Sequence, residues 1–136
     1  MQIMRNIKNE YKILLIIILL AVIAVFIAAV SAVYLKDSSD KLLAVCDIIS
    51  EGISGDNLSI IAQGVSQLTF DWSSIKDIWF MLLDHADVHK VEEFITEVNF
   101  YTEHRLFAEA ERHIRLLKII LEDIGMADSV SFLTVI

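Results

Sequence analysis

The sequence contains no proline and only four glycines among its 136 residues. Proline breaks helix interiors and glycine destabilises them by about 1 kcal/mol relative to alanine, so few positions interrupt helix formation. This composition excludes a collagen-like chain and an intrinsically disordered one. The single cysteine, Cys46, excludes an internal disulfide and a thiolate metal cluster. The length allows one domain and an anchor.

One long apolar run extends from Ile13 to Leu35 and contains no charged residue. As a helix, 23 residues span about 35 Å, which is enough to cross a hydrocarbon core of about 30 Å. Sixteen of these residues are Leu, Ile, Val or Phe, and each favours insertion by about 0.3–0.6 kcal/mol at the centre of a span. We therefore expect residues 13–35 to form a transmembrane helix in contact with membrane lipid.

The charges that flank this run predict its orientation. Basic residues number three before the run and two after it: Arg5, Lys8 and Lys12, then Lys36 and Lys41. Because positive charge is retained on the cytoplasmic side, we expect residues 1–12 in the cytoplasm and the rest of the chain outside it. The protein is then a single-pass protein of the cell membrane with an extracytoplasmic domain.

A cleaved signal peptide is the alternative for the same run. The small residues Val30 to Ala32 would provide the cleavage site, and the product would be a secreted helical protein. The apolar stretch before Ser31 is longer than the 7–15 residues typical of signal peptides, which favours the membrane anchor.

Residues 36–125 are expected to form an extracytoplasmic helical domain. Its first helix repeats apolar residues three and four apart, at Leu42, Cys46, Ile49 and Ile53. This helix either begins at an N-cap within Ser38–Asp40 or continues straight out of the membrane. Gly52 and Gly55 are expected to end it, and Asp56-Asn57 to cap the next helix.

The second helix has the clearest pattern in the chain. Apolar residues recur alternately three and four positions apart at Leu58, Ile61, Val65, Leu68, Trp72, Ile75, Trp79, Leu82 and Ala86. This spacing predicts one helix of about 30 residues with Gly64 inside it. We expect the following turn at residues 84–87, with Asp87 capping the third helix. Both tryptophans lie on the packed stripe, which favours core packing over ligand stacking.

Two further helices are expected before the C-terminal tail. The third has its apolar residues at Val91, Phe94, Ile95, Val98 and Tyr101, with a turn near Glu103-His104, and the fourth at Phe107, Ala110, Ile114, Leu117, Leu121 and Ile124. We expect the fourth helix to stop at Gly125 and the tail, residues 126–136, to dock in an extended form. Short connections favour antiparallel neighbours. The fold class is therefore all-α: an N-terminal transmembrane helix followed by an antiparallel helical bundle or hairpin stack with a long second helix.

The core of this domain is expected to contain eleven particular side chains. They are Leu68, Trp72, Ile75, Trp79, Leu82, Phe94, Val98, Phe107, Ile114, Leu117 and Leu121.

Trp72, Trp79 and His85 in the run DWSSIKDIWFMLLDH, with the N-terminal span before them, carry a resemblance to a known family. Residues 38–136 resemble the domain of unknown function 4363 family, whose members are small membrane-anchored helical proteins of Gram-positive, mostly spore-forming bacteria. The resemblance implies a helical body in the cell envelope. It implies no activity.

The candidates for metal binding are two histidines and two aspartates: His85, His89, Asp84 and Asp87. The histidines are four residues apart, which suits a metal if both lie on one helix. The helix boundary expected between them breaks that geometry, so we favour a hydrogen bond from His85 near Trp79 and an exposed His89. No metal and no cofactor is expected. Cys46 lies on an apolar stripe, which favours core packing over a bridge between two chains.

The domain after the run carries 8 basic and 18 acidic residues. Such a surface repels nucleic acid and anionic headgroups. Acidic residues concentrate on the third helix and basic ones on the fourth, which favours pairing across the hairpin over a dipolar docking surface. Glu109–Arg112 and Glu111–Arg115 are the expected local pairs.

No nucleophile elbow, glycine-rich phosphate loop or Ser/His/Asp set occurs in the sequence, so we do not expect an enzyme. The expected function is that of a membrane protein whose outer domain binds an unknown protein partner or assembles into a homo-oligomer. The alternative is an extracytoplasmic module that senses a ligand or a metal.

Overall fold

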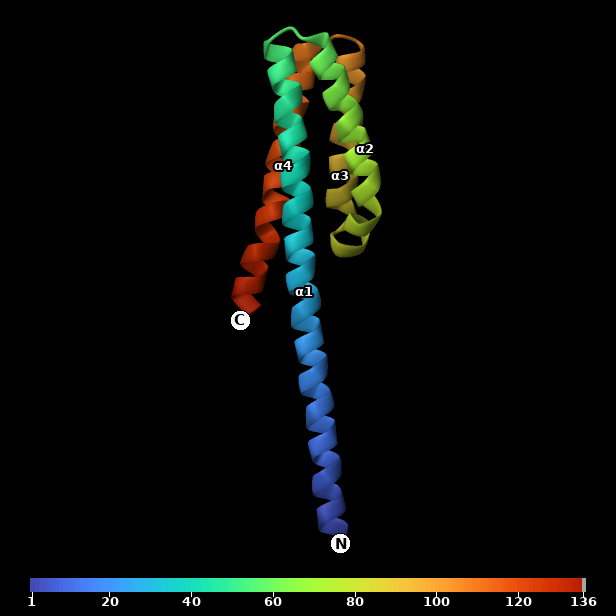
Figure 1. Cartoon of the computed structure of the whole chain (residues 1–136), viewed down its shortest axis with the longest axis vertical. Helices are drawn as coiled ribbons and strands as arrows, with labels where there is room; N and C mark the ends of the chain where they lie inside the picture. The colour runs from blue at the N-terminus through green and yellow to red at the C-terminus, as the bar shows by residue number, and fades with distance from the viewer. Residues whose placement is uncertain (136) are drawn as a thin grey trace.

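The computed structural model describes the backbone of residues 1–135 and the side chains of residues 1–126. In this part the chain forms four helices: α1 (Gln2–Ser54), α2 (Leu58–Leu82), α3 (His85–Glu103) and α4 (Phe107–Val135). Figure 1 shows them packed antiparallel, with α1 and α3 each contacting both α2 and α4. The expected all-α fold, with an apolar N-terminal helix and an antiparallel bundle, is confirmed.

Helix α1 is unbroken for 53 residues. Its N-terminal half projects from the bundle and its C-terminal half is part of the bundle (Figure 1). The possible N-cap residues Ser38, Ser39 and Asp40 all lie inside this helix. The serine hydroxyls donate to carbonyls: Ser38 Oγ to Tyr34 O at 2.7 Å, and Ser39 Oγ to Leu121 O at 3.1 Å. Of the two sequence alternatives, the continuous helix is the one that forms.

The end of α1 and the start of α2 agree with the sequence. Gly55 is the C-cap of α1, and its N–H donates to Glu51 O at 3.0 Å. The Asn57 side chain caps α2 by accepting a hydrogen bond from Ile60 N at 3.2 Å. A side-chain acceptor at this position satisfies one of the free N–H groups of the first turn.

Helix α2 has 25 residues, shorter than expected, and ends at Leu82. The N-cap of α3 is Asp84, whose side chain accepts a hydrogen bond from Ala86 N at 3.1 Å, so the prediction of Asp87 as the cap was wrong. The apolar repeat from Leu58 to Ala86 therefore extends over two helices, because α2 ends at Leu82 and α3 begins at His85. Leu82 and Ala86 do not lie on the packed face of α2. Both are exposed, which contradicts the prediction of Leu82 as a core residue.

The core runs along the axis of the bundle and includes most of the expected side chains. Seven of the eleven are buried: Leu68, Trp72, Trp79, Val98, Ile114, Leu117 and Leu121. Ile75, Phe94 and Phe107 are half-buried. The side of the core formed by α1 consists of Leu35, Leu42, Val45, Cys46 and Ile49.

Helix α4 continues through Gly125 to Val135, so the predicted helix end and extended tail were wrong. Gly125 is buried against α1, where a Cβ would lie 3.5 Å from Ser39 Cβ. A glycine inside a helix costs about 1 kcal/mol, which helix packing overrides. The predicted docking of the tail side chains lies outside the described residues.

Candidate functional site

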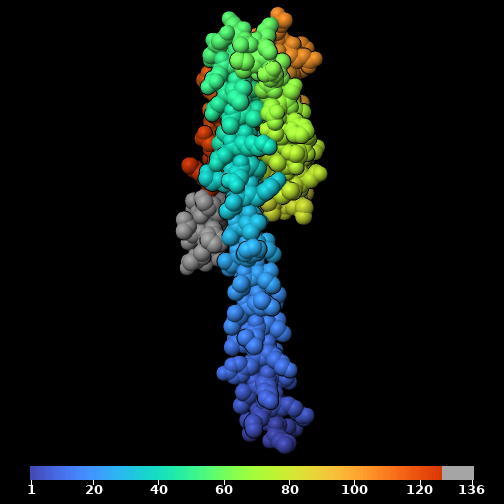
Figure 2. Space-filling model, in the orientation of Figure 1, coloured from blue at the N-terminus to red at the C-terminus, as the bar shows by residue number. Residues whose placement is uncertain are grey.

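The apolar segment of α1, residues 13–33, presents large side chains to the outside. Their exposed fractions range from 44% at Ile23 to 68% at Phe26. This part of α1 is long and apolar enough to cross a membrane, and its most apolar window is not buried by the rest of the described chain. Figure 2 shows the segment standing clear of the body. An apolar surface of this extent needs lipid or another apolar partner.

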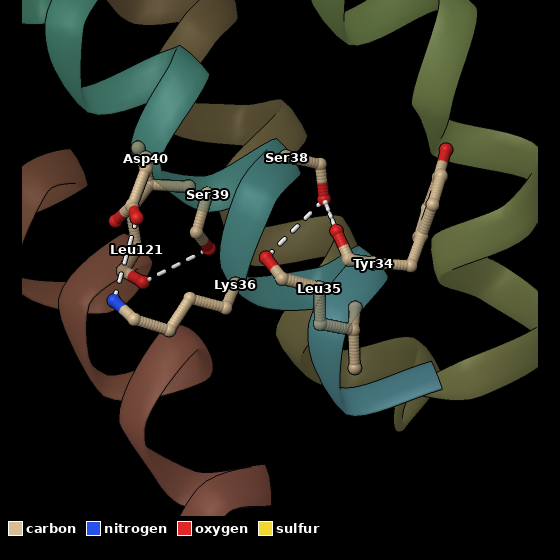
Figure 3. A network of polar contacts seen from close by, with 7 residues as sticks. All are labelled: Tyr34, Leu35, Lys36, Ser38, Ser39, Asp40 and Leu121. Carbon is tan, nitrogen blue, oxygen red and sulfur yellow. Dashed lines mark hydrogen bonds and ion pairs between the residues drawn. The ribbon is translucent and has the colours of Figure 1, made fainter. Parts of the chain in front are cut away.

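Burial on α1 begins at Leu35, and two serines just beyond it join α1 to its neighbours. Trp79 Nε1 on α2 donates to Ser38 Oγ at 2.9 Å, and Ser39 Oγ donates to the Leu121 carbonyl of α4 at 3.1 Å. Figure 3 shows the Ser39 bond to α4 and the Ser38 bonds to the Tyr34 and Leu35 carbonyls of α1 itself. The hydrogen bonds from Trp79 and to Leu121 set the axial positions of α2 and α4 relative to α1.

From the sequence, these two serines were predicted only as possible helix caps, although a signal of their burial was present. They fall between Leu35 and Leu42 on the three-and-four spacing of the buried face of α1. Polar residues on such a stripe are buried when they find hydrogen-bond partners, as both serines do here.

A buried carboxylate that the sequence did not single out lies beside them on α2. Asp71 is 1% exposed. Its Oδ1 accepts from Gln67 Nε2 at 2.8 Å and lies 3.4 Å from Lys41 Nζ of α1. In the described part of the chain, Asp71 Oδ2 has no hydrogen-bond partner. The Lys41 side chain is 62% exposed, so this pair joins a buried carboxylate to an ammonium group at the surface and links α1 to α2.

The four metal-binding candidates are brought near one another but are used structurally. His85 and His89 are both in α3, so the helix boundary predicted between them was wrong. Both rings pack edge-on against Phe80, with centroids 5.3 and 5.2 Å away, in place of the hydrogen bond expected near Trp79. Asp84 is the cap of α3 and Asp87 lies in its first turn. Among the described side chains, no group of three or more His, Cys, Asp or Glu residues could hold a metal ion.

Cys46 is fully buried in the core. Burial raises the pKa of its thiol to about 12, from an ordinary value of 9.0, because the thiolate would lose its hydration. A neutral, buried thiol of this kind packs as a small apolar side chain and is inert.

Ion pairs join the helices in a pattern that differs from the one expected. Across the α3–α4 hairpin, His113 Nε2 lies 3.0 Å from Glu97 Oε2. Other pairs join α1 to α4 and α2 to α3: Lys118–Asp47 at 2.6 Å and Lys76–Glu92 at 3.7 Å. The local pair Glu111–Arg115 forms at 3.8 Å, whereas Glu109 and Arg112 form no ion pair in the described part of the chain. These pairs are mostly exposed and contribute about 0–1 kcal/mol each.

An open groove of about 610 Å³ lies between α2, α3 and the start of α4. Its lining includes Leu58, Ile61, Val65, Thr69, Asn99 and Phe107. Two of its polar lining groups bond to each other, because Asn99 Nδ2 donates to Thr69 Oγ1 at 3.0 Å. Thr102, Glu103 and Arg105 also line the groove, so it offers both apolar area and polar groups.

The fold and these surfaces together define an all-α domain with an apolar N-terminal helix and a packed apolar core. Residues 29–134 match the family described as domain of unknown function (DUF4363). The match covers most of the chain, so the protein belongs to this family and the resemblance seen in the sequence is confirmed. Comparisons with curated proteins and with solved structures give no significant match.

Proposed function

We propose that the protein is a single-pass membrane protein whose helical body, on the extracytoplasmic side, is a protein-interaction or self-assembly module. The observation that carries the proposal is the division of α1 into two parts. Its apolar segment is exposed, and the part beyond it is a wall of the bundle core. One helix is thus both anchor and structural element.

The dimensions of the apolar segment support membrane insertion. From Ile13 to Val33 the helix rises about 30 Å, which equals the thickness of a typical hydrocarbon core. Burial begins near the end of this segment, where Ser31, Ala32 and Tyr34 are half-buried, and it is complete at Leu35. The signal-cleavage alternative requires the chain to open within this helix, at Val30 to Ala32, where Ser31 and Ala32 are half-buried.

Exposed aromatic side chains on the body support an interaction role. Phe70 on α2 is 67% exposed and Phe100 on α3 is 52% exposed. Interfaces are enriched in such side chains because they remove a large apolar area from water. Phe70 also borders a shallow hollow lined by Ala62, Gln63, Ser66 and Gln67.

Photo-cross-linking from this surface in native membranes tests the interaction. A photoreactive amino acid at Gln63 should give an adduct of defined mass, either a homodimer or a complex with one other protein. Phe70→Ala should abolish the adduct, and Phe100→Ala, a matched change away from the hollow, should leave it. Monomer alone, or an adduct indifferent to Phe70→Ala, would contradict this role.

Cysteine accessibility in intact cells tests the anchor and its orientation. A membrane-impermeant maleimide should label Ser59→Cys, on the exposed face of α2, in intact cells and Gln2→Cys only after lysis. The opposite pattern would reverse the orientation. Release of the body into the medium, with a mass that lacks the first thirty residues or so, would favour signal cleavage.

A further inference from the structure

The hydrogen bonds between α1 and its neighbours determine where the bundle ends relative to the apolar segment. Trp79 on α2 lies at the height of Ser38, as their 2.9 Å hydrogen bond requires. α2 ends three residues later, about 5 Å further toward the N-terminal end of α1. Because the helices are antiparallel, the end of α2 lies at the height of Leu35, within one turn of the top of the apolar segment.

Helix α4 reaches the same height and continues beyond it. Its Leu121 carbonyl is bonded to Ser39, and Gly125 faces the same serine. From Gly125 the helix extends for ten more residues, about 15 Å, in the direction of the apolar segment. Figure 1 shows α4 passing the α2–α3 turn alongside α1.

The end of α2 at this height carries exposed apolar side chains, which we name the base patch: Ile78, Met81 and Leu82. Their exposed fractions are 42%, 85% and 36%. Among the described side chains, Met81 is the most exposed large apolar side chain of the bundle. It lies about three residues along the helix axis, or about 5 Å, from the level of Val33, which is 61% exposed. The base patch therefore continues the apolar surface of the anchor.

We propose that the base patch rests on the bilayer that α1 crosses, with Met81 at the boundary between headgroups and acyl chains. This inference relies on the proposed membrane anchor. Lipid is the occupant that the geometry favours, because α1 holds the bilayer permanently at this height, which gives it a very high effective concentration. Asp84 and Asp87 beside the patch suit an uncharged lipid surface better than an anionic one.

Fluorescence depth measurements on the full-length protein in phosphatidylcholine vesicles test the proposal. An environment-sensitive dye is attached at Met81→Cys, and in a second protein at Ser74→Cys; the native Cys46 is buried and stays unlabelled. Ser74 is the matched control because it is exposed on the same face of α2, seven residues or about 10 Å further from the base. Ile78 and Leu82 are unchanged in both proteins.

The expected result is that the dye at position 81 is quenched at least twofold more by lipids with a spin label near the headgroup than the dye at position 74. Iodide in the water should show the reverse order. Equal quenching at both positions by iodide, with no effect of the labelled lipid, would overturn the proposal. Protection at position 81 that disappears as the protein is diluted in lipid would also overturn it, by assigning the patch to a second copy.

A separate measurement keeps this result distinct from the proposed function. The same vesicles are extracted with alkaline carbonate, which removes peripheral proteins and leaves spanning ones. Retention of a protein whose position 81 is exposed to iodide rejects the base contact and leaves the anchor intact. Loss of the protein from the vesicles rejects the anchor, and with it the base contact.

Discussion

At the scale of single residues, polar groups inside the bundle set the position of one helix against another. Ser38 accepts a hydrogen bond from Trp79, Ser39 donates one to α4, and Lys41 pairs with the buried Asp71. Trp72, which stacks edge-on against Trp79 at 5.5 Å, has a buried Nε1 without a hydrogen-bond partner among the described residues. The sequence pattern places both tryptophans on the same apolar stripe. In the described part of the chain, however, only the Nε1 of Trp79 has a hydrogen-bond partner.

Cys46 makes the stability of the protein depend on alkaline pH. Its pKa in the folded protein, about 12, is above the ordinary value of 9.0, so its contribution to stability is complete below pH 9 and is lost as the pH rises toward 12. The free energy of unfolding should fall by about 1 kcal/mol per pH unit in this range from this group alone. Urea unfolding of the full chain in detergent, followed by circular dichroism, measures it.

Cys46→Ala is the control for this prediction. The raised pKa of Lys118 acts in the same direction at higher pH, and its chief cause, the hydrogen bond to Asp47, is present in both proteins. The variant should therefore show a shallower decline between pH 9 and 12, whatever its stability at pH 7. Parallel declines in the two proteins would refute the assignment to the thiol.

At the scale of helices, two glycines mark two different kinds of contact with α1. A Cβ at Gly64 of α2 would lie 2.6 Å from Ile49 Cγ1, and Ile49 is fully buried. A Cβ at Gly125 of α4 would meet Ser39 Cβ at 3.5 Å, an ordinary contact distance. The first position needs glycine for close approach, and the second does not.

Alanine at these two positions should therefore have opposite effects. Gly64→Ala should destabilise the protein by about 1–3 kcal/mol, because the overpacking of α1 against α2 exceeds the gain in helix propensity. Gly125→Ala should stabilise it by up to about 1 kcal/mol. The midpoints of urea unfolding of both variants measure the effects. A stabilising Gly64→Ala would show that α1 and α2 are less closely packed than described.

The sequence was sufficient for some elements because their signals are local. The apolar run, the end of α1 at Gly55 and the Asn57 cap each depend on residues within one or two turns. The start of α3 could not be chosen, because Asp84 and Asp87 are equally good caps. In the structure α3 begins at His85, and the rings of His85 and His89 both pack against Phe80. This contact cannot be inferred from the spacing of residues in a single sequence.

The other differences between prediction and structure depend on partners distant in the sequence. Taken alone, Gly125 is typical of a helix end. In the bundle it lies inside α4 and faces Ser39 of α1. Asp71 reads as a surface residue, and its burial requires Lys41 of another helix. The base patch could not be predicted, because Leu82 follows the apolar spacing of α2 and therefore looks like a core residue. It is exposed because α2 ends at Leu82.

At the scale of the whole molecule, α1 is a single rod that joins the apolar segment to the bundle. Spin labels at Ile18 and Glu51, both exposed on α1, are separated by 33 residues, or about 50 Å of helix. Pulsed electron paramagnetic resonance in lipid nanodiscs should give one narrow distance near this value.

Asp37→Pro is the comparison for the rod. Proline inside a helix removes a hydrogen bond and bends the chain, so the variant should give a shorter and broader distribution of distances. Asp37 is exposed, so the substitution removes no buried side chain. A native distribution as broad as that of the proline variant would show a joint in α1 that the structure does not contain.

Since α1 is one unbroken helix, any inclination of its apolar segment in the proposed membrane would incline the whole bundle with it. About 28 Å of helix stands between Leu35 and Ser54, so an inclination of about 20°, typical of single spans, carries the far end of the body about 10 Å sideways. Inclination responds to the match between helix length and bilayer thickness. The lateral reach of the far turn, and hence the neighbours it meets, would then depend on how thick the surrounding lipid is.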